Sequence, residues 1–189
     1  MPLRTVVLDA NVLVMAALRD TLLRAADAAL YRLAWSEDIL AEVERTLVDK
    51  GMTTKLQARL LLDVMRAAFP DAAVTGYRAR LSHMTNDPKD RHVLAAAVTA
   101  GAPVIVTANL KHFRAEALAP YAITAQSPDD FLCDLSASSP ERLGQIIRAQ
   151  ARDLVRPPLS VPALLSLLAR QQAPQFAARF SAYMMPGEE

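Results

Sequence analysis

The chain has 189 residues, 52% of them hydrophobic, which suits one domain or one domain with a helical appendage. Its formal net charge of +1 lacks the basic excess typical of proteins that bind nucleic acid over a large surface. The single cysteine, Cys133, excludes an internal disulfide and a cysteine-rich zinc site, and it fits a reducing cytoplasm. No apolar stretch reaches the roughly 20 residues that a membrane span needs, and no signal-peptide layout is present, so we expect a soluble cytoplasmic protein.

The first predicted strand ends at an acidic residue. Residues Thr5–Leu8 are an apolar, β-branched run typical of a buried parallel strand, and Asp9 follows directly. Helical patterns are then predicted over residues 10–18, 21–33, 36–50 and 53–69, and a short strand over residues 73–75. Ser36 is a favourable N-cap for the third of these helices. In the fourth, we expect Leu56, Leu60 and Val64 to face inward.

The second half continues the alternation of strands and helices. Asp90 begins a very apolar helix, which Gly101 ends at the usual position for glycine. Val104–Val106 is apolar throughout and predicts a central strand. A strand is predicted near residues 122–125 and a helix from Pro128, followed by helices over residues 142–154, 161–170 and 173–183. The order of elements predicts an α/β fold with a mostly parallel sheet in residues 1–135 and a helical extension in residues 136–189.

Oxygen-bearing side chains follow the predicted strands or begin the helices between them. Asp9 lies at the end of the first strand and Asn109 shortly after the strand Val104–Val106. Asp90 begins the helix that leads into that strand, and Glu42 lies beside the apolar stripe of an earlier helix. Ligands of parallel sheets bind beyond the carboxyl ends of the strands, so these side chains can converge on one point.

A group of oxygen ligands without histidine or cysteine suits a hard cation such as Mg²⁺ or Mn²⁺. Simpler roles stay open for each residue on spacing alone. Asp9 can cap a helix, Glu42 can be a solvated surface acid, Asp90 can stabilise a helix N-terminus by roughly 0.3–1 kcal/mol, and Asn109 can be a turn residue. His92 and His112 suggest a rival site, although isolated histidines are more often packed or hydrogen-bonded. The five glycines form no phosphate-binding loop.

Four segments resemble the motifs of PIN-domain ribonucleases, in the order that this family has them. They are Val7 to Leu13, Ser36 to Leu47, Asp87 to Ala97, which is the most specific, and Val104 to Phe113. The resemblance covers about residues 3–135 and implies a three-layer α/β/α fold. The C-terminal helices are less specifically similar to an extension found in one subgroup of the family.

The resemblance implies a metal-dependent endoribonuclease in which Asp9, Glu42 and Asp90 hold Mg²⁺ or Mn²⁺. Asn109 stands where the family often has a fourth acid, and it can still offer a carbonyl ligand. Asn11 would orient Asp9, Thr107 would hold a water, and Asp87 would support the acids. The resemblance also implies a VapC-like toxin of a type II toxin–antitoxin pair, usually a homodimer inhibited by a small antitoxin protein.

The expected reaction is hydrolysis of an RNA phosphodiester bond by a water that Asp90 or Asp87 helps to deprotonate. Arg91, Lys111 and Arg114 flank the expected cleft and can contact phosphates, although solvated surface charge explains them equally well. One alternative is a non-catalytic module that binds RNA or protein. Another is a metal-dependent phosphatase or DNA nuclease with a similar group of acids.

Overall fold

A computed structural model describes residues 3–153 and 159–184 of the chain. The chain divides into two compact units, which we describe separately. The first contains the residues up to Val14 together with Tyr31–Ala125, and the second contains Met15–Leu30 together with the residues from Gln126 onward. Of the described helices, none combines the length and the apolar character needed to cross a membrane.

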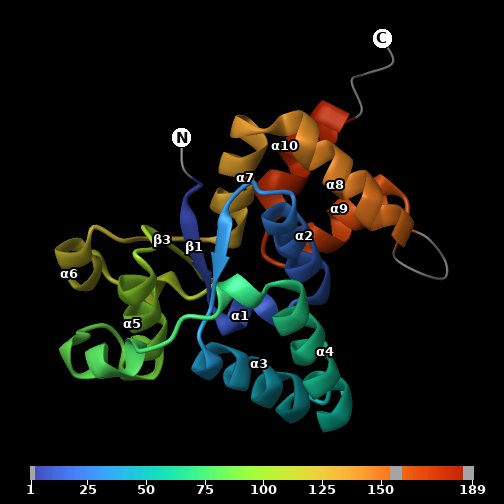
Figure 1. Ribbon diagram of the computed structural model, residues 1–189. Coiled ribbons are helices and arrows are strands. Elements are labelled where there is room, and N and C mark those ends of the chain that lie inside the picture. The colour runs from blue at the N-terminus through green and yellow to red at the C-terminus, as the bar shows by residue number, and fades with distance from the viewer. Residues whose placement is uncertain (1–2, 154–158, 185–189) are drawn as a thin grey trace. The chain divides into compact units, whose positions relative to one another are not determined.

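A four-stranded sheet forms the centre of the first unit, in the order β2-β1-β3-β4 (Figure 1). The strands are β1 (Thr5–Leu8), β2 (Arg32–Ala34), β3 (Val104–Val106) and β4 (Thr124–Gln126), the last of which reaches the boundary between the units. Strand β1 pairs in parallel with both β2 and β3, with Val7 opposite Ala34 and Ile105. Because β1 has a neighbour on each side, its residues Val6, Val7 and Leu8 are completely buried. The predicted α/β class with a parallel central sheet and C-terminal helices is confirmed.

Helices of the first unit position the loops at the carboxyl ends of the strands. They are α1 (Ala10–Leu13), α3 (Glu37–Asp49), α4 (Lys55–Ala68), α5 (Arg91–Ala100) and α6 (Ala115–Leu118). Helix α3 begins as predicted at Ser36, whose hydroxyl accepts a hydrogen bond from the Ile39 amide at 3.2 Å. Helix α5 packs on β1 and β3, and it ends at Gly101 with φ +60°, a conformation that glycine adopts at little cost.

The helix predicted over residues 21–33 is wrong at its C-terminal end. Helix α2 (Ala16–Asp27) stops earlier, and Ala29 takes a positive φ of 55° directly after it. Residues 32–34 are strand β2, because pairing with β1 buries Leu33 and Ala34. Tertiary pairing here overrides a local pattern that reads as helical.

The strand predicted over residues 73–75 is reduced to one parallel bridge between Trp35 and Ala73. The Trp35 amide donates to the Ala72 carbonyl at 2.9 Å, and the Val74 amide donates to the Trp35 carbonyl at 2.8 Å. A short 3₁₀ helix over Pro70–Ala72 precedes the bridge and leaves no room for a longer ladder.

The predicted inward face of α4 is wrong. Leu56, Leu60 and Val64 are 69%, 56% and 66% exposed. The buried residues of α4 are Ala58, Leu62 and Met65, on the face that packs against α3. The sequence of α4 carries leucines around most of its circumference, so its periodicity alone selects no single face.

The second unit is a helical bundle. It contains α2, α7 (Pro128–Ser138), α8 (Pro140–Asp153), α9 (Val161–Arg170) and α10 (Pro174–Met184). Buried Gln150 accepts from the Thr21 hydroxyl at 2.7 Å, and buried Asp129 accepts from the amides of Gln175 and Phe176 at the start of α10. The boundary expected between residues 135 and 136 falls inside α7, and the whole of that helix belongs to this unit.

Candidate metal centre

Asp9 and Thr107 come together because β1 and β3 are parallel neighbours that end side by side. Asp9 follows the last residue of β1, Thr107 follows the last residue of β3, and the Asp9 amide donates to the Val106 carbonyl at 3.0 Å. The Thr107 hydroxyl donates to Oδ2 of Asp9 at 2.7 Å. Asp9 is 1% exposed and Thr107 is fully buried, so this contact is shielded from bulk water.

Asn11 ties the ends of the two strands together. Its Nδ2 donates to Oδ2 of Asp9 at 2.6 Å and lies 3.0 Å from the Thr107 hydroxyl. Its Oδ1 accepts from the Ala108 amide at 2.9 Å. The orienting role predicted for Asn11 has this geometry, because the amide holds the Asp9 carboxylate in one position.

The surroundings of the Asp9 carboxyl destabilise its charged form. Its pKa is raised from 3.8 to about 6: burial is the largest cause, the hydrogen bond from Thr107 opposes the rise, and the negative charges of Asp90 and Glu42 contribute to it. The charges of the other two predicted catalytic acids, Asp90 and Glu42, therefore reach the buried Asp9 carboxyl. A divalent cation among them would relieve both the burial cost and the repulsion.

Asp90 lies 8% exposed at the start of α5 and contacts a histidine rather than a helix amide. Nδ1 of His112 is 2.6 Å from Oδ2 of Asp90 and 3.2 Å from Nδ2 of Asn109. One ligand atom from each of Asp87, Asp90 and His112 lies within 4.8 Å of the other two. Asp87 is held by its own turn, in which Oδ1 accepts from the Lys89 amide at 3.0 Å.

Glu42 projects from α3 and pairs with the other histidine of the region. Nε2 of His92 is 3.2 Å from Oε2 of Glu42, whose side chain is 30% exposed. The contact joins the first turn of α5 to α3, two helices that pack against each other. Carboxylates, amide groups and a hydroxyl form an oxygen-rich donor set with one imidazole inside it, which fits a divalent cation.

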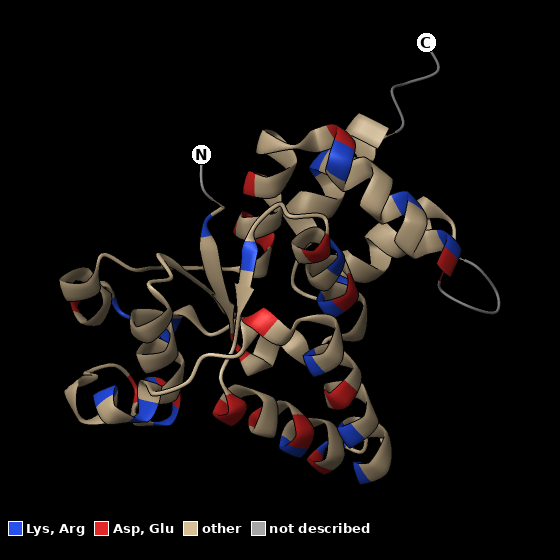
Figure 2. Ribbon diagram, viewed as in Figure 1, with Lys and Arg blue, Asp and Glu red and all other residues tan. Residues whose placement is uncertain are grey.

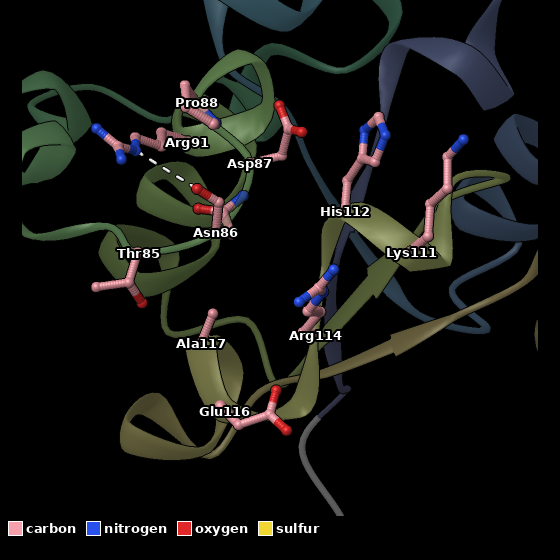
Figure 3. Close-up of a pocket in the computed structure, with 10 residues that line it drawn as sticks. All are labelled: Thr85, Asn86, Asp87, Pro88, Arg91, Lys111, His112, Arg114, Glu116 and Ala117. Carbon is pink, nitrogen blue, oxygen red and sulfur yellow. Dashed lines mark hydrogen bonds between the residues drawn. The ribbon is translucent and has the colours of Figure 1, made fainter.

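A cavity of about 830 Å³ opens beside Asp87 and His112. Its wall also includes the predicted phosphate contacts Arg91, Lys111 and Arg114, together with Thr85, Asn86, Pro88, Glu116 and Ala117. Figure 3 shows Arg114 pointing towards the middle of the cavity, whereas Arg91 turns away to donate to the Asn86 carbonyl at 3.5 Å.

The three cations of the cavity wall differ from most arginines of α3, α4 and their surroundings. Arg59, Arg66 and Arg78 each form an ion pair with an acid of α3. Figure 2 shows acidic and basic residues mixed along α3 and α4. Within the described part of the chain, the cavity cations have no carboxylate at ion-pair distance. Their positive charge is therefore available to an anionic ligand beside the acids.

The structure thus places the predicted site residues in one region of the first unit. Asp9, Asn11 and Thr107 share hydrogen bonds, Asp90 and Asn109 meet at His112, and Glu42 reaches Asp9 through its charge. Sequence reasoning missed the contact of each histidine with a predicted ligand. His112 follows Asn109 by three residues within one short turn, and this spacing was a signal that both side chains share one side of the loop.

Models of known protein families match residues in each of the two units. A family model described as "PIN domain" matches residues 5–111, and one described as "VapC50 C-terminal domain" matches residues 128–182. The chain is 47% identical over 104 residues to "Putative ribonuclease VapC50" of Mycobacterium tuberculosis (strain ATCC 25618 / H37Rv). This alignment covers 55% of the chain and 61% of that protein, which is less than two thirds of its length. No solved structure matches the chain. The PIN-domain match includes Asp9, Glu42, Asp90 and Asn109 and ends one residue before His112.

Proposed function

The chain belongs to the PIN-domain family, and from that premise we propose that it is a metal-dependent endoribonuclease that hydrolyses RNA phosphodiester bonds. The buried Asp9 carboxylate carries this proposal. It is fixed by Asn11 and Thr107, repelled by two further acids, and lies in the unit whose cavity has uncompensated cations. A carboxylate buried at such a cost is typical of functional sites rather than of structural ones.

We assign metal binding to Asp9, Glu42 and Asp90, with Asn109 nearby and Mg²⁺ or Mn²⁺ as the ion. When bound, the cation supplies Lewis acidity to the phosphodiester and lowers the pKa of water. Asn11 and Thr107 keep the Asp9 carboxylate oriented, which reduces the reorganisation needed when the charge on the phosphate develops.

The cavity supplies the remaining groups. We assign acceptance of the proton of the attacking water to Asp87, which lies half-buried in the cavity wall. Arg114 points into the cavity and stabilises the negative charge of the phosphate, while Arg91 and Lys111 position neighbouring phosphates of the strand. These three cations all line one cavity, and this limited charged surface suits a few nucleotides rather than a long duplex.

We further propose that the protein acts in the cytoplasm as the toxin of a toxin–antitoxin pair, as a homodimer bound by a small antitoxin protein. The relative named above is called "Putative ribonuclease VapC50", and residues 128–182 of this chain match the model for the C-terminal domain of the same name. The test is co-expression with the product of an adjacent small reading frame. Suppression of RNA cleavage and a complex of defined mass in solution are the expected results.

The nuclease proposal is tested with purified chain and a panel of single-stranded RNA, structured RNA, DNA and a phosphate monoester. The wild-type chain should cleave RNA with Mg²⁺ or Mn²⁺ and stop when a chelator is added. Asp9→Asn and Asp90→Asn should abolish cleavage while the protein stays folded. Asp71→Asn is the matched control, because Asp71 is an exposed acid of the same unit.

Cleavage by the folded Asp9→Asn and Asp90→Asn variants at the wild-type rate would overturn the proposal. Binding of RNA that a chelator does not affect, without cleavage at any metal concentration, would identify a non-catalytic binding module instead. Preferential hydrolysis of DNA or of the monoester would change the substrate class.

A further inference from the structure

We propose that His112 is a direct ligand of the divalent cation, so that the centre is a mixed nitrogen and oxygen site that prefers Mn²⁺ to Mg²⁺. The inference deepens the proposed function and rests on the metal centre proposed there. It concerns the identity of a ligand and of the ion, and it can therefore be tested by measurements other than RNA cleavage.

The separation of the donor atoms fits a single ion. One atom each from Asp87, Asp90 and His112 lies within 4.8 Å of the others. Two ligands about 2.1 Å from one octahedral ion are separated by about 3.0 Å when they are at right angles and by about 4.2 Å when they are opposite. Nδ1 of His112 and Oδ2 of Asp90 lie 2.6 Å apart, so an ion bound by both requires a side-chain shift of about 0.4 Å, which small torsion changes allow.

The surroundings of Nδ1 of His112 favour a cation over a simple hydrogen bond. Oδ2 of Asp90, at 2.6 Å, is an acceptor and requires a proton on Nδ1. Nδ2 of Asn109, at 3.2 Å, is a donor and requires a lone pair on the same nitrogen. One neutral tautomer of the imidazole cannot satisfy both contacts.

Rotation of the Asn109 amide by half a turn would place its oxygen beside Nδ1 instead. Nδ1 would then face the oxygen acceptors of Asn109 and Asp90. In that orientation, an ion bound by Nδ1 would be faced by the Asn109 carbonyl oxygen and by the Asp90 carboxylate. The Nε2–H tautomer of His112 presents Nδ1 in the form that this binding needs.

The ligand set determines which ion is preferred. Mg²⁺ takes oxygen ligands and loses its hydration water reluctantly, whereas Mn²⁺ accepts carboxylates and binds nitrogen more readily. Asn109 can offer the ion only a neutral carbonyl oxygen. The imidazole nitrogen of His112 would add a stronger dative bond. The PIN-domain match ends one residue before His112, and the resemblance assigns no metal-binding role to this histidine.

The experiment measures nitrogen hyperfine coupling to bound Mn²⁺ by pulsed electron paramagnetic resonance, using the full chain. The three histidines of the chain allow a matched comparison of His112→Ala, His92→Ala and His83→Ala. His83 is exposed and lines a different cavity. We expect coupling in the wild type, its loss in His112→Ala and its retention in the other two variants.

Calorimetric titrations supply the second readout. His112→Ala should weaken Mn²⁺ binding by about 10–100-fold, with a smaller effect on Mg²⁺. His112→Asp replaces nitrogen with oxygen, so it should restore metal binding, leave the nitrogen signal absent and reduce the preference for Mn²⁺. This variant also keeps the test valid if the alanine variant unfolds.

Nitrogen coupling that persists in His112→Ala, or wild-type protein that binds Mn²⁺ without nitrogen coupling, would overturn the assignment. Failure of the nuclease proposal has a different outcome, namely normal nitrogen coupling in a protein that cleaves no RNA. Absence of any Mn²⁺ binding, together with cleavage that resists chelation, would overturn the metal centre itself and the His112 assignment with it.

Discussion

Replacing Asp9 by asparagine should make the metal-free protein more stable while removing metal binding. The folded chain raises the pKa of Asp9 from 3.8 to about 6, so ionisation of this carboxyl opposes folding. Both hydrogen bonds described from Asn11 and Thr107 reach the same oxygen, Oδ2. A single amide oxygen in the Asp9→Asn variant can accept both of them, so the substitution removes the charge and keeps these contacts.

The sign and size of the effect follow from proton linkage. At a pH below 3.8 both the folded and the unfolded chain hold the proton, and Asp9 contributes no pH dependence. As the pH rises towards 6 and above, the unfolded chain loses the proton first, so the wild-type free energy of unfolding falls. The advantage of the asparagine variant should therefore be about 1 kcal/mol near pH 4.5 and about 3 kcal/mol near pH 7.5.

Urea unfolding in the presence of a chelator measures this difference. Trp35 is the only tryptophan, it is 1% exposed, and it belongs to the unit that holds Asp9, so its fluorescence reports on that unit. Asp71→Asn is again the control and should differ from wild type by the same small amount at both pH values. Saturating Mn²⁺ should stabilise the wild type and not Asp9→Asn. A wild-type-to-variant difference that stays constant between the two pH values would refute the reasoning.

Three further predictions concern other parts of the first unit. Thr107→Val removes a donor to the buried carboxylate, and calorimetry should show metal binding weakened by about 10–100-fold in a folded protein. Arg114→Ala should reduce the salt dependence of RNA binding by about one charge in fluorescence anisotropy, whereas Arg66→Ala, which breaks a surface ion pair, should leave it unchanged. Leu60→Lys on the exposed face of α4 should change the unfolding free energy by less than about 0.5 kcal/mol, whereas Leu62→Ala should cost about 2–5 kcal/mol. Equal losses for the two leucine variants would show that α4 is rotated relative to the structure.

Strong local signals made part of the fold predictable. The apolar runs of β1 and β3 predict that these strands are buried, and a serine N-cap marks the start of α3. Asp9 and Asp90 could be located because they end or begin such elements. The ends of parallel neighbours meet at one edge of a sheet, so the meeting of Asp9 with the residues after β3 follows from topology alone.

Features that depend on partners distant in sequence were not predictable. Strand β2 has three residues and forms because it pairs with β1. Its own sequence pattern is helix-like, so the sequence alone predicted a helix there. The face of α4 that packs is decided by α3, not by the distribution of its own leucines. The pairing of His112 with Asp90 spans 22 residues and depends on how two loops fold over each other, which neither sequence segment encodes by itself.

The central position of β1 has a consequence for synthesis. This strand is made first, yet its neighbours β2 and β3 are made later, and Thr107 comes 98 residues after Asp9. A chain that ends between Asp90 and β3 contains all three acids, but it lacks the Thr107 donor and His112. Such a fragment also lacks β3, one of the two strands that pair with β1 and bury it. Premature termination before β3 should therefore yield products in which the proposed metal centre is incomplete.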